Sequence, residues 1–480
     1  MTMWQPVFMI SGYILGILGL IMLIPAGLDM SVTSADWSPF LSSAMVAVFF
    51  GFALFLSNYT KIERITLKQG YLITVVSWFL SCLFSAVPFW LYLDRESALD
   101  GLFEAVSGLT GTGASIMEDV ESLPPAILLW RSLLNYIGGL GIVIFAVALL
   151  PFLGIGGMQI FQHENSDSND KFMPKFSYIA KRIVFVYLLL FGVACCCMFL
   201  CGMSWFDAAN HAMSAIGTGG FSSRNGSIGS FNSFPIELCT MIFMLAGALP
   251  MTFYILLWRR SEADKNHQVR SFLKIVLVAI LCLSGYLYAK SEYSLFEALR
   301  YASFTAISVI TTTGLTSCDY ITWGAWIAAV ILFLSLIGSC TGSTSGSIKI
   351  LRWQVIHAFL RKYLLSAIEP NRVIPLKIGK VNMSEKVTMS VFVYVFSFLI
   401  CLAVLVLAVS ACGLDFKTAM AVVVSCIANV GVGSVEVIGP SGNFAFLPDT
   451  IKFILCFAMI LGRLEVISVL VIFSKSFWRA

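Results

Sequence analysis

The chain has 480 residues, of which 59% are hydrophobic and 12% are charged, and its formal net charge is +4. Soluble domains average about 45–50% apolar and about 25% charged residues, so the composition argues against a soluble globular protein. Because the basic residues gather between apolar runs, the small positive charge reflects topology in a membrane and not affinity for nucleic acid.

Ten apolar runs are long enough to cross a bilayer, which takes ~20 helical residues. The first run has no basic residue before it and is longer than the apolar core of a signal peptide, so we expect it to be retained. The sequence therefore predicts an all-α polytopic membrane protein. The runs lie near residues 7–28, 39–57, 70–93, 125–153, 183–203, 235–258, 271–289, 323–348, 388–412 and 450–474.

The basic residues predict the orientation. If the amino terminus is cytoplasmic, ten crossings return the carboxyl terminus to the same side. Most of the 30 Lys and Arg then fall in or beside cytoplasmic segments, most densely between residues 349 and 386. This bias is the positive-inside rule, so we expect both termini to be cytoplasmic.

An internal repeat organises the chain. Four times, a spanning run is followed by a short helical stretch, a turn rich in glycine and threonine, and a second spanning run. The short stretches occupy 97–109, 204–216, 294–310 and 415–428, and are expected to stop part-way through the membrane. Each has an acid near its start, which complements the positive end of a helix dipole. The acids are Asp100, Asp207, Glu297 and Asp415.

The four turns read LTGTGAS, AIGTGGFS, ITTTGLTS and NVGVGS. One such turn would indicate only a helix end or close helix packing. Irregular backbone at membrane depth is tolerated where it is buried in protein or lines a watery pathway. Four turns around one axis would present rings of carbonyl oxygens that replace the water shell of a potassium ion, with threonine hydroxyls as further ligands or ties.

We align the turns on Gly113, Gly219, Gly314 and Gly433. The candidate potassium ligands are Thr110, Gly111, Thr112, Gly113, Ile216, Gly217, Thr218, Gly219, Thr311, Thr312, Thr313, Gly314, Asn429, Val430, Gly431, Val432 and Gly433.

Two further features suggest regulation. The stretch GSCTGSTSGS at 338–347 interrupts an apolar segment; it is either a kink or close helix contact, or a loop that blocks and clears a pore. Arg463 lies midway along the last run, where an ionisable group is costly and a functional candidate. We expect it to face the pore just inside the filter, or else to tie helices together. The gating candidates are Arg463, Gly338, Gly342, Gly346 and Lys349.

Other charged residues in the apolar runs have simpler interpretations. Glu465 lies two positions from Arg463, so on one helix the two side chains would not face each other. Arg131 and Lys452 lie near helix ends and are expected to extend to the membrane surface.

The repeat, together with NYIGGLGIVIFAVALLPFLGIGGMQIF at 135–161, GSCTGSTSGSIKILRW at 338–353 and LGRLEV at 461–466, resembles the Trk/Ktr/HKT superfamily of potassium transporters, most closely its TrkH branch. The resemblance implies four membrane–pore-helix–membrane repeats in a pseudo-fourfold arrangement, preceded by a two-helix domain. It also implies potassium uptake across the bacterial inner membrane, with potassium as the transported ion, no organic cofactor and no enzymatic activity. The implied partners are a second copy of the chain, a cytosolic nucleotide-binding ring of the TrkA type and membrane lipids.

The expected division is 1–65 for the two-helix domain, then 66–175, 176–265, 266–383 and 384–480 for the repeats. One departure from the family pattern is Gly111, where a threonine is expected; glycine there keeps the carbonyl but loosens the turn, which bears on selectivity. An alternative function is a secondary symporter coupled to protons or sodium, which would use broken helices near the midplane but is usually built of two related halves.

Overall fold

The computed structural model describes residues 3–31, 37–61, 65–92, 98–153, 172–258, 267–290, 293–372, 374–379 and 381–479. Residues 154–161, which carry part of the resemblance, and the expected domain limit at 265 lie outside these ranges. The expected limit at 175 falls within helix α9 (Phe172–Leu200).

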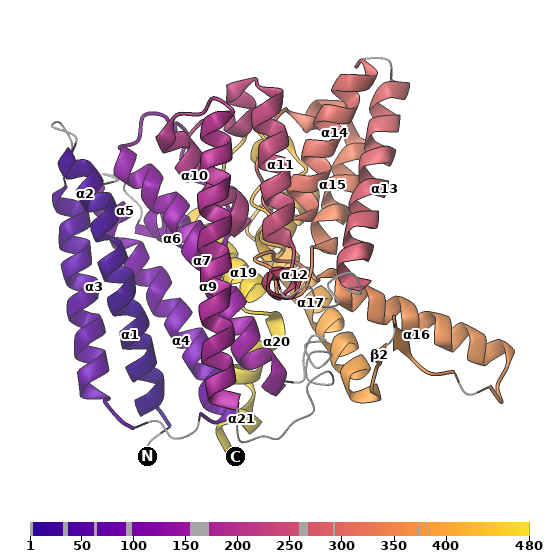
Figure 1. The fold of residues 1–480 in the computed structure, drawn as a ribbon, viewed down its shortest axis with the longest axis horizontal. Helices are drawn as coiled ribbons and strands as arrows, with labels where there is room; N and C mark the ends of the chain where they lie inside the picture. The colour runs from indigo at the N-terminus through magenta and orange to yellow at the C-terminus, as the bar shows by residue number, and fades with distance from the viewer. Residues whose placement is uncertain are drawn as a thin grey trace.

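The amino-terminal domain packs by backbone contact. Helix α1 (Gln5–Ile21) continues into α2 (Leu23–Ser31) and lies against α3 (Ser38–Ser57), at the indigo edge of Figure 1. A Cβ added to Gly12 would lie 2.6 Å from the carbonyl oxygen of Gly51, and one added to Gly51 would lie 2.6 Å from the nitrogen of Gly16. Small residues at such crossings let two helices approach closely where lipid offers no hydrophobic driving force.

Four repeats follow, each with a short pore helix between longer helices. The first contains α4 (Leu67–Ser85), α5 (Val87–Tyr92), α6 (Ala98–Thr110) and α7 (Pro125–Leu153). The second contains α9, α10 (Trp205–Gly217), η2 (Ser227–Phe231), α11 (Phe234–Ala248) and α12 (Met251–Trp258). The third contains α13 (His267–Ala289), α14 (Leu295–Ile310), η4 (Tyr320–Trp323), α15 (Ala325–Ile337) and α16 (Ile350–Ile368). The fourth contains α17 (Glu385–Ala411), α18 (Phe416–Ile427), η5 (Glu436–Ile438), α19 (Asp449–Arg463), α20 (Val466–Leu470), η6 (Val471–Phe473) and α21 (Lys475–Arg479).

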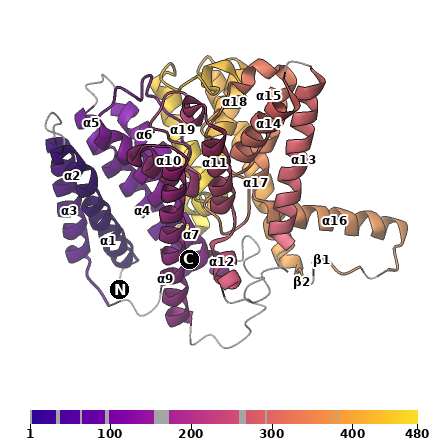
Figure 2. The same ribbon diagram turned by 45° about the horizontal axis from the view of Figure 1, so that its top comes forward.

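The repeats close into a ring. Each pore helix packs against a longer helix of its own repeat and against the second long helix of the preceding repeat. Thus α10 lies against α11 and α7, α14 against α15 and α11, α18 against α19 and α15, and α6 against α7 and α19. The last contact joins the fourth repeat to the first, and the tilted view of Figure 2 shows the pore helices gathered at one end of the molecule. The predicted pseudo-fourfold helical architecture is therefore confirmed.

The acids at the pore-helix starts do more than complement dipoles. Glu297 forms a capping box with Ser294, and the Asp415 side chain caps α18. Asp100 instead binds Lys452 at 2.6 Å, and Asp207 binds Arg224 at 2.8 Å. For these two residues the helix dipole alone was an incomplete explanation.

Two of the ten predicted crossings are bent and not continuous helices, and a third breaks where the sequence already predicts an interruption. Among the described residues, seven helices are long and apolar enough to span a membrane, or up to nine if two bent pairs each count as one span. The run at 235–258 bends by 93° between α11 and α12, where Pro250 lacks an N–H, and the run at 450–474 bends by 112° after α19. The run at 323–348 leaves the helical conformation after Ile337, at Gly338 with φ 70°.

One helix stands apart from the bundle. Figures 1 and 2 both show α16 extending away from the other helices. It leads to a short antiparallel hairpin of β1 (Lys377–Ile378) and β2 (Val381–Asn382), the one exception to the all-α prediction among the described residues. The two chain termini lie at the same end of the molecule, at the bottom of Figure 1.

The glycine contact in the amino-terminal domain gives a stability prediction. We expect Gly12→Ala to destabilise the protein by roughly 1–3 kcal/mol, because the new methyl group would push against backbone atoms of α3. Gly27→Ala is the matched control, since a Cβ at Gly27 meets nothing within 4 Å. Thermal unfolding of both variants in detergent tests this; equal melting temperatures would contradict the close crossing.

Candidate functional site

The four pore helices end in the same turn. In each, a residue in the left-handed conformation follows the helix, and the next N–H reaches back to the carbonyl of a serine, which is the hydrogen-bond pattern of a Schellman motif. The left-handed residues are Gly111, Thr218, Thr312 and Asn429, with φ of 64°, 49°, 56° and 55°. The reaching pairs are Thr112–Ser107, Gly219–Ser214, Thr313–Ser308 and Val430–Ser425, all at 2.9 Å.

A second left-handed residue follows in every repeat, and here all four are glycine. They are Gly113, Gly220, Gly314 and Gly431, with φ of 78°, 82°, 77° and 81°. The register predicted from the sequence was therefore right in repeats 1 and 3. It was wrong by one residue in repeat 2, where Gly220 and not Gly219 is equivalent to Gly113, and by two residues in repeat 4, where Gly431 and not Gly433 takes that place.

These glycines bring the four turns into a closed ring. A Cβ added to Gly113 would run into the carbonyl oxygen of Gly219, and one on Gly220 would run into that of Thr313. Likewise Gly314 faces the carbonyl of Val430, and Gly431 faces that of Thr112. Each repeat thus presents a carbonyl to the glycine of the preceding repeat, and only a residue without a side chain fits between them.

Four hydrogen bonds join the segments that directly follow the ring. We call this side of the ring its collar face. Each bond joins one repeat to the next, including the fourth to the first. The four bonds are Val120 N to Asn225 Oδ1 at 2.7 Å, Gly229 N to Thr316 O at 3.1 Å, Tyr320 Oη to Gly433 O at 2.9 Å and Phe444 N to Ser115 O at 2.8 Å. Asn225 also donates a hydrogen bond to Asp119 on this face, which lowers the pKa of the Asp119 carboxyl.

The second long helices also touch the turns through glycine. A Cβ on Gly247 would lie 2.6 Å from the carbonyl oxygen of Ile216. Gly138 and Gly462 approach the equivalent carbonyls of Leu109 and Ile427 in the same way. The last turn of the pore helix is therefore held against backbone and not against side chains in three of the four repeats.

The threonine hydroxyls of the turns tie the protein together. Thr110 and Thr112 share a hydrogen bond of 2.8 Å, and Thr311 and Thr313 share another of the same length. Asn429 of repeat 4 donates to the Thr112 hydroxyl at 2.9 Å, which joins repeat 4 to repeat 1. Of the two roles expected for threonine, these contacts favour tying the turns.

On the opposite side of the ring, which we call the loop face, lies the non-helical segment 338–349. It exchanges hydrogen bonds with the broken end of α11: Cys340 N donates to Ala248 O, and Gly342 O accepts from Met251 N. Thr344 Oγ1 donates to Ile216 O and to Gly247 O, both at 3.1 Å. Backbone groups freed by one break are thus satisfied by the other, as burial in a membrane requires.

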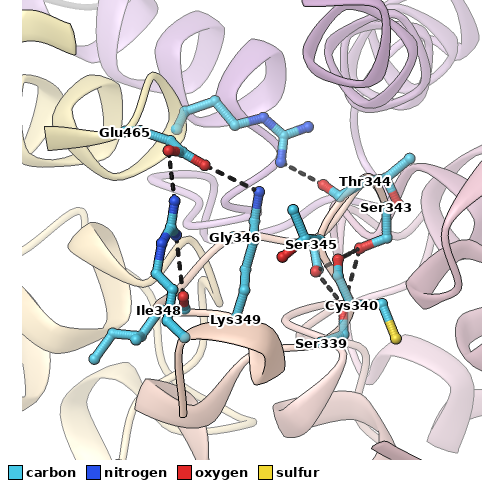
Figure 3. Close-up of polar contacts among 12 residues, drawn as sticks. Ser339, Cys340, Ser343, Thr344, Ser345, Gly346, Ile348, Lys349 and Glu465 are labelled. Atoms are coloured by element: carbon cyan, nitrogen blue, oxygen red, sulfur yellow. Dashed lines mark hydrogen bonds and ion pairs between the residues drawn. The ribbon is translucent and has the colours of Figure 1, made fainter. Parts of the chain in front are cut away.

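Inside this segment three serines bond to one another. Figure 3 shows Ser339, Ser343 and Ser345 joined by dashed lines, and the Ser343–Ser345 distance is 2.9 Å. The segment is fully packed, with residues 339–350 all buried. Of the two readings from sequence, the structure favours a buried loop with its own hydrogen bonds over a simple helix kink.

The left-handed residues of the ring point their side chains at this loop. Thr218 Oγ1 lies 3.0 Å from Thr344 Oγ1, and Gly346 N donates to Thr312 Oγ1 at 2.9 Å. In repeat 1 the equivalent residue is Gly111, and the guanidinium of Arg463 takes the side-chain position: a Cβ on Gly111 would lie 3.3 Å from its Nη2. The departure at Gly111 therefore makes room for Arg463 in a left-handed turn that suits glycine.

Arg463 is buried and only partly bonded. Its Nη1 donates to the carbonyl of Thr344 at 2.5 Å, while Nε and Nη2 have no hydrogen-bond partner among the described residues. The guanidinium lies beside the turn of repeat 1 and ties α19 to the loop. Buried donors left without protein partners commonly bind ordered water.

Glu465 anchors the far end of the loop. Helix α19 ends at Arg463, and Glu465, with φ 62°, turns away to bind Arg352 at 2.6 Å and Lys349 at 3.5 Å. Figure 3 shows Glu465 facing Lys349. The Arg352 guanidinium also lies over the Tyr394 ring, 3.6 Å from its centroid. The predicted absence of a local Arg463–Glu465 pair is confirmed, although the cause is the bend and not helical spacing.

The sequence interpretation of two charged residues was wrong, and one sequence signal was missed. Arg131 and Lys452 do not extend to a membrane surface; they are 2% and 5% exposed and bind Glu104 and Asp100. The serines that close the four turns were also missed. A serine six positions before each ring glycine, at 107, 214, 308 and 425, was the signal that would have fixed the register.

Comparison with known proteins identifies the family. The chain matches TrkH, a family of cation transport proteins, over residues 38–479. The chain belongs to the TrkH family. It is 36% identical over 482 residues to the Trk system potassium uptake protein TrkI of Halomonas elongata, covering 99% of this chain and 97% of that protein.

Further relatives agree. TrkG of Escherichia coli, also a Trk system potassium uptake protein, is 36% identical over 86% of each chain. The crystal structure of the potassium transporter TrkH from Vibrio parahaemolyticus superposes with a TM-score of 0.92 at 29% identity and covers 100% of both chains. Membership in the TrkH family makes the chain an integral membrane transport protein and not an enzyme.

The ring register can be tested by a matched pair of glycine variants. We expect Gly431→Ala to lower the ratio of rubidium to sodium uptake by reconstituted protein, because a methyl group at a left-handed residue collides with the carbonyl of Thr112. Gly433→Ala should change that ratio less, since Gly433 has no left-handed φ and its methyl group would meet the Ile438 side chain and not the carbonyl of a neighbouring repeat. A larger effect at Gly433 would restore the alignment expected from the sequence.

Proposed function

We propose that the chain takes up potassium across the bacterial inner membrane through one central pore, with the ring of turns as its selectivity filter. The closed ring of backbone carbonyls built by Gly113, Gly220, Gly314 and Gly431 carries this proposal. The printed names of the relatives, which are potassium uptake proteins, support the same ion.

The pore helices supply the electrostatics. All four end at the ring, so the negative ends of four helix dipoles point at a cation held there. Carbonyl oxygens on a ring of fixed size replace the water shell of potassium or rubidium, and a smaller ion such as sodium fits this ring less well. No organic cofactor takes part in this mechanism.

The loop 338–349 and Arg463 form the gate. The loop lies directly against two ring side chains, Thr218 and Thr312, and so closes the path on the loop face. Arg463 adds a fixed positive charge beside Gly111. Opening the pore then requires breaking the hydrogen bonds from the loop to α11 and to Arg463, and Glu465 holds the loop's far end through Lys349.

A symporter coupled to protons or sodium is the second candidate. The bent pairs α11–α12 and α19–α20 favour it, because secondary transporters bind ions at broken helices. The fourfold ring favours the channel-like mechanism, since symporters usually have two related halves.

Partners follow from the surfaces. Both termini, α16 and the hairpin are assigned to the cytoplasmic side, where the basic residues between 349 and 386 obey the positive-inside rule and offer a surface to a nucleotide-binding ring of the TrkA type. Helix α16 extends from the bundle and exposes apolar side chains, including Leu360, Tyr363 and Ile368, which suits packing against a second copy in a homodimer. We also propose that membrane lipids surround the exposed apolar helix faces. The same proposal divides the chain into a domain at 1–65 and four repeats at 66–175, 176–265, 266–383 and 384–480.

The proposed function is tested by rubidium uptake into liposomes that contain the purified protein. With a rubidium gradient alone we expect uptake that exceeds sodium uptake and persists when an uncoupler abolishes any proton gradient. Uptake that requires an inward proton or sodium gradient would favour the symporter, and equal uptake of rubidium and sodium would contradict the filter.

Arg463 gives a separate prediction. Two unit charges ~6 Å apart at an effective dielectric of ~20 interact by roughly 3 kcal/mol before water screens them, which sets an upper limit of roughly a hundredfold on the barrier. We therefore expect Arg463→Ala to increase rubidium uptake severalfold and Arg463→Lys, which keeps the charge, to leave it nearly unchanged.

Melting temperatures of the same preparations provide the control for Arg463. If the residue only fastens the loop through Thr344, the alanine variant will melt earlier and conduct no faster. That result would contradict its role as an electrostatic barrier.

A further inference from the structure

A buried ion pair lies behind the ring on its collar face. Glu104 of pore helix α6 is fully buried and Arg131 of α7 is 2% exposed; Nε of Arg131 donates to Oε1 of Glu104 at 2.7 Å. Taking both charges out of water is costly, and such a pair persists only where further hydrogen bonds satisfy it. The contacts that satisfy this pair all lie in the non-helical segments that directly follow Gly113 and Gly220. We call these segments the ring strands of repeats 1 and 2, although they are not β-strands.

On the first strand, Glu104 holds two consecutive residues. Its Oε1 accepts from Ser115 Oγ at 3.0 Å, and its Oε2 accepts from the backbone N–H of Ile116 at 3.1 Å. These residues begin two positions after the ring residue Gly113. One carboxylate therefore fixes the exit of the repeat 1 strand to the pore helix of the same repeat.

Arg131 carries the contact across to the second strand. Its Nη2 donates to Ser115 Oγ at 3.0 Å and its Nη1 to the carbonyl of Ser222 at 3.1 Å. Ser222 stands two positions after Gly220, so it is the equivalent of Ser115 in repeat 2. The guanidinium also lies over the Phe221 ring, 4.2 Å from its centroid. A planar group with several donors can hold both strands at once, which a lysine cannot do.

The residue equivalent to Glu104 is polar in repeat 2 but not in every repeat. It stands three residues before Ser107, and the equivalent residue of repeat 2 is His211, which lies 2.9 Å from Ser222 Oγ. In repeats 3 and 4 the same position is Thr305 and Val422. The polar network of Glu104, Arg131 and His211 therefore braces the ring at the junction of repeats 1 and 2.

We propose that Glu104 and Arg131 are positioning residues for ion selection: the pair sets the spacing of the repeat 1 and repeat 2 carbonyls and thereby the preference for potassium-sized ions. This assignment rests on the proposed filter function. Neither side chain touches the ion; each acts through Ser115, Ile116 and Ser222, which continue directly from the ring.

Variants that break the bridge differently test the assignment. Glu104→Gln keeps an acceptor for Ile116 N but replaces the charged contact to Arg131, and Arg131→Lys keeps the charge but cannot span both strands. For each we expect the ratio of rubidium to sodium uptake in liposomes to fall about fivefold, equivalent to ~1 kcal/mol of ion preference. Ser115→Ala, which removes one shared hydroxyl, should cause a smaller fall and serves as the mild variant if the others fold poorly.

The ion pair of Arg300 and Glu237 is the matched control. Its Glu237 is buried and its Arg300 is 14% exposed; the pair has the same 2.7 Å distance and joins α14 to α11 without a hydrogen bond to a ring strand. Glu237→Gln and Arg300→Lys should lower the melting temperature and leave the uptake ratio unchanged. If the Glu104, Arg131 and Ser115 variants behave like these controls, the positioning role is overturned and the pair is structural.

The wild-type ratio separates this assignment from the function on which it rests. A wild-type protein that takes up rubidium and sodium equally would overturn the proposed filter, and the positioning role with it. A clear wild-type preference that survives in the Glu104 and Arg131 variants would overturn the positioning role alone. As a readout independent of flux, the extra thermal stability that potassium gives over sodium should shrink in these variants and persist in the controls.

Discussion

Four backbone turns meet around one axis with no side chain between them, and the rest of the structure serves this contact. Each ring glycine lies against the carbonyl of the next repeat, so an added methyl group has no space. The turns can reach that position only if every pore helix stops at the same depth. The common hydrogen bond back to a serine, and the glycine contacts from Gly138, Gly247 and Gly462, achieve this with backbone alone.

The membrane makes irregular backbone expensive, and the protein meets the cost by pairing its irregular parts. The loop 338–349 bonds to the carbonyls and the N–H freed where α11 breaks, and it bonds again to ring side chains. Arg463 and Glu465 flank a second break and hold the same loop from the other side. The break in one repeat therefore depends on the break in another, so that movement of the loop disturbs several elements at once.

The chemistry is less symmetric than the fold. Ion pairs join repeat 4 to repeat 1 through Lys452 and Asp100, and repeat 2 to repeat 3 through Arg300 and Glu237. A third, between Arg352 and Glu465, joins repeat 3 to repeat 4. The junction of repeats 1 and 2 has the Arg131 bridge, and on the collar face the Tyr320 hydroxyl joins repeat 3 to repeat 4 through the carbonyl of Gly433. Pseudo-fourfold geometry is kept by the backbone, while side chains give each junction its own stiffness. A single chain with four different repeats permits this asymmetry, which four identical subunits would forbid.

The sequence by itself determined the membrane class, the four repeats, the pore helices and the non-helical segment at 338–347, because apolar run length, caps and glycine are local signals. It placed the ring correctly at Gly113 and Gly314. At Gly219–Gly220 and Gly431–Gly433 two glycines compete, and only contact with the neighbouring repeats selects one of them. Tertiary structure likewise decided which partners the side chains of Arg131 and Lys452 bind. Lys452 has its partner Asp100 in another repeat, 352 residues away, and the contacts of Arg131 include Ser222 of the next repeat, 91 residues away. No local pattern carries such distances: a buried charge is placed by whichever partner the closed ring brings to it.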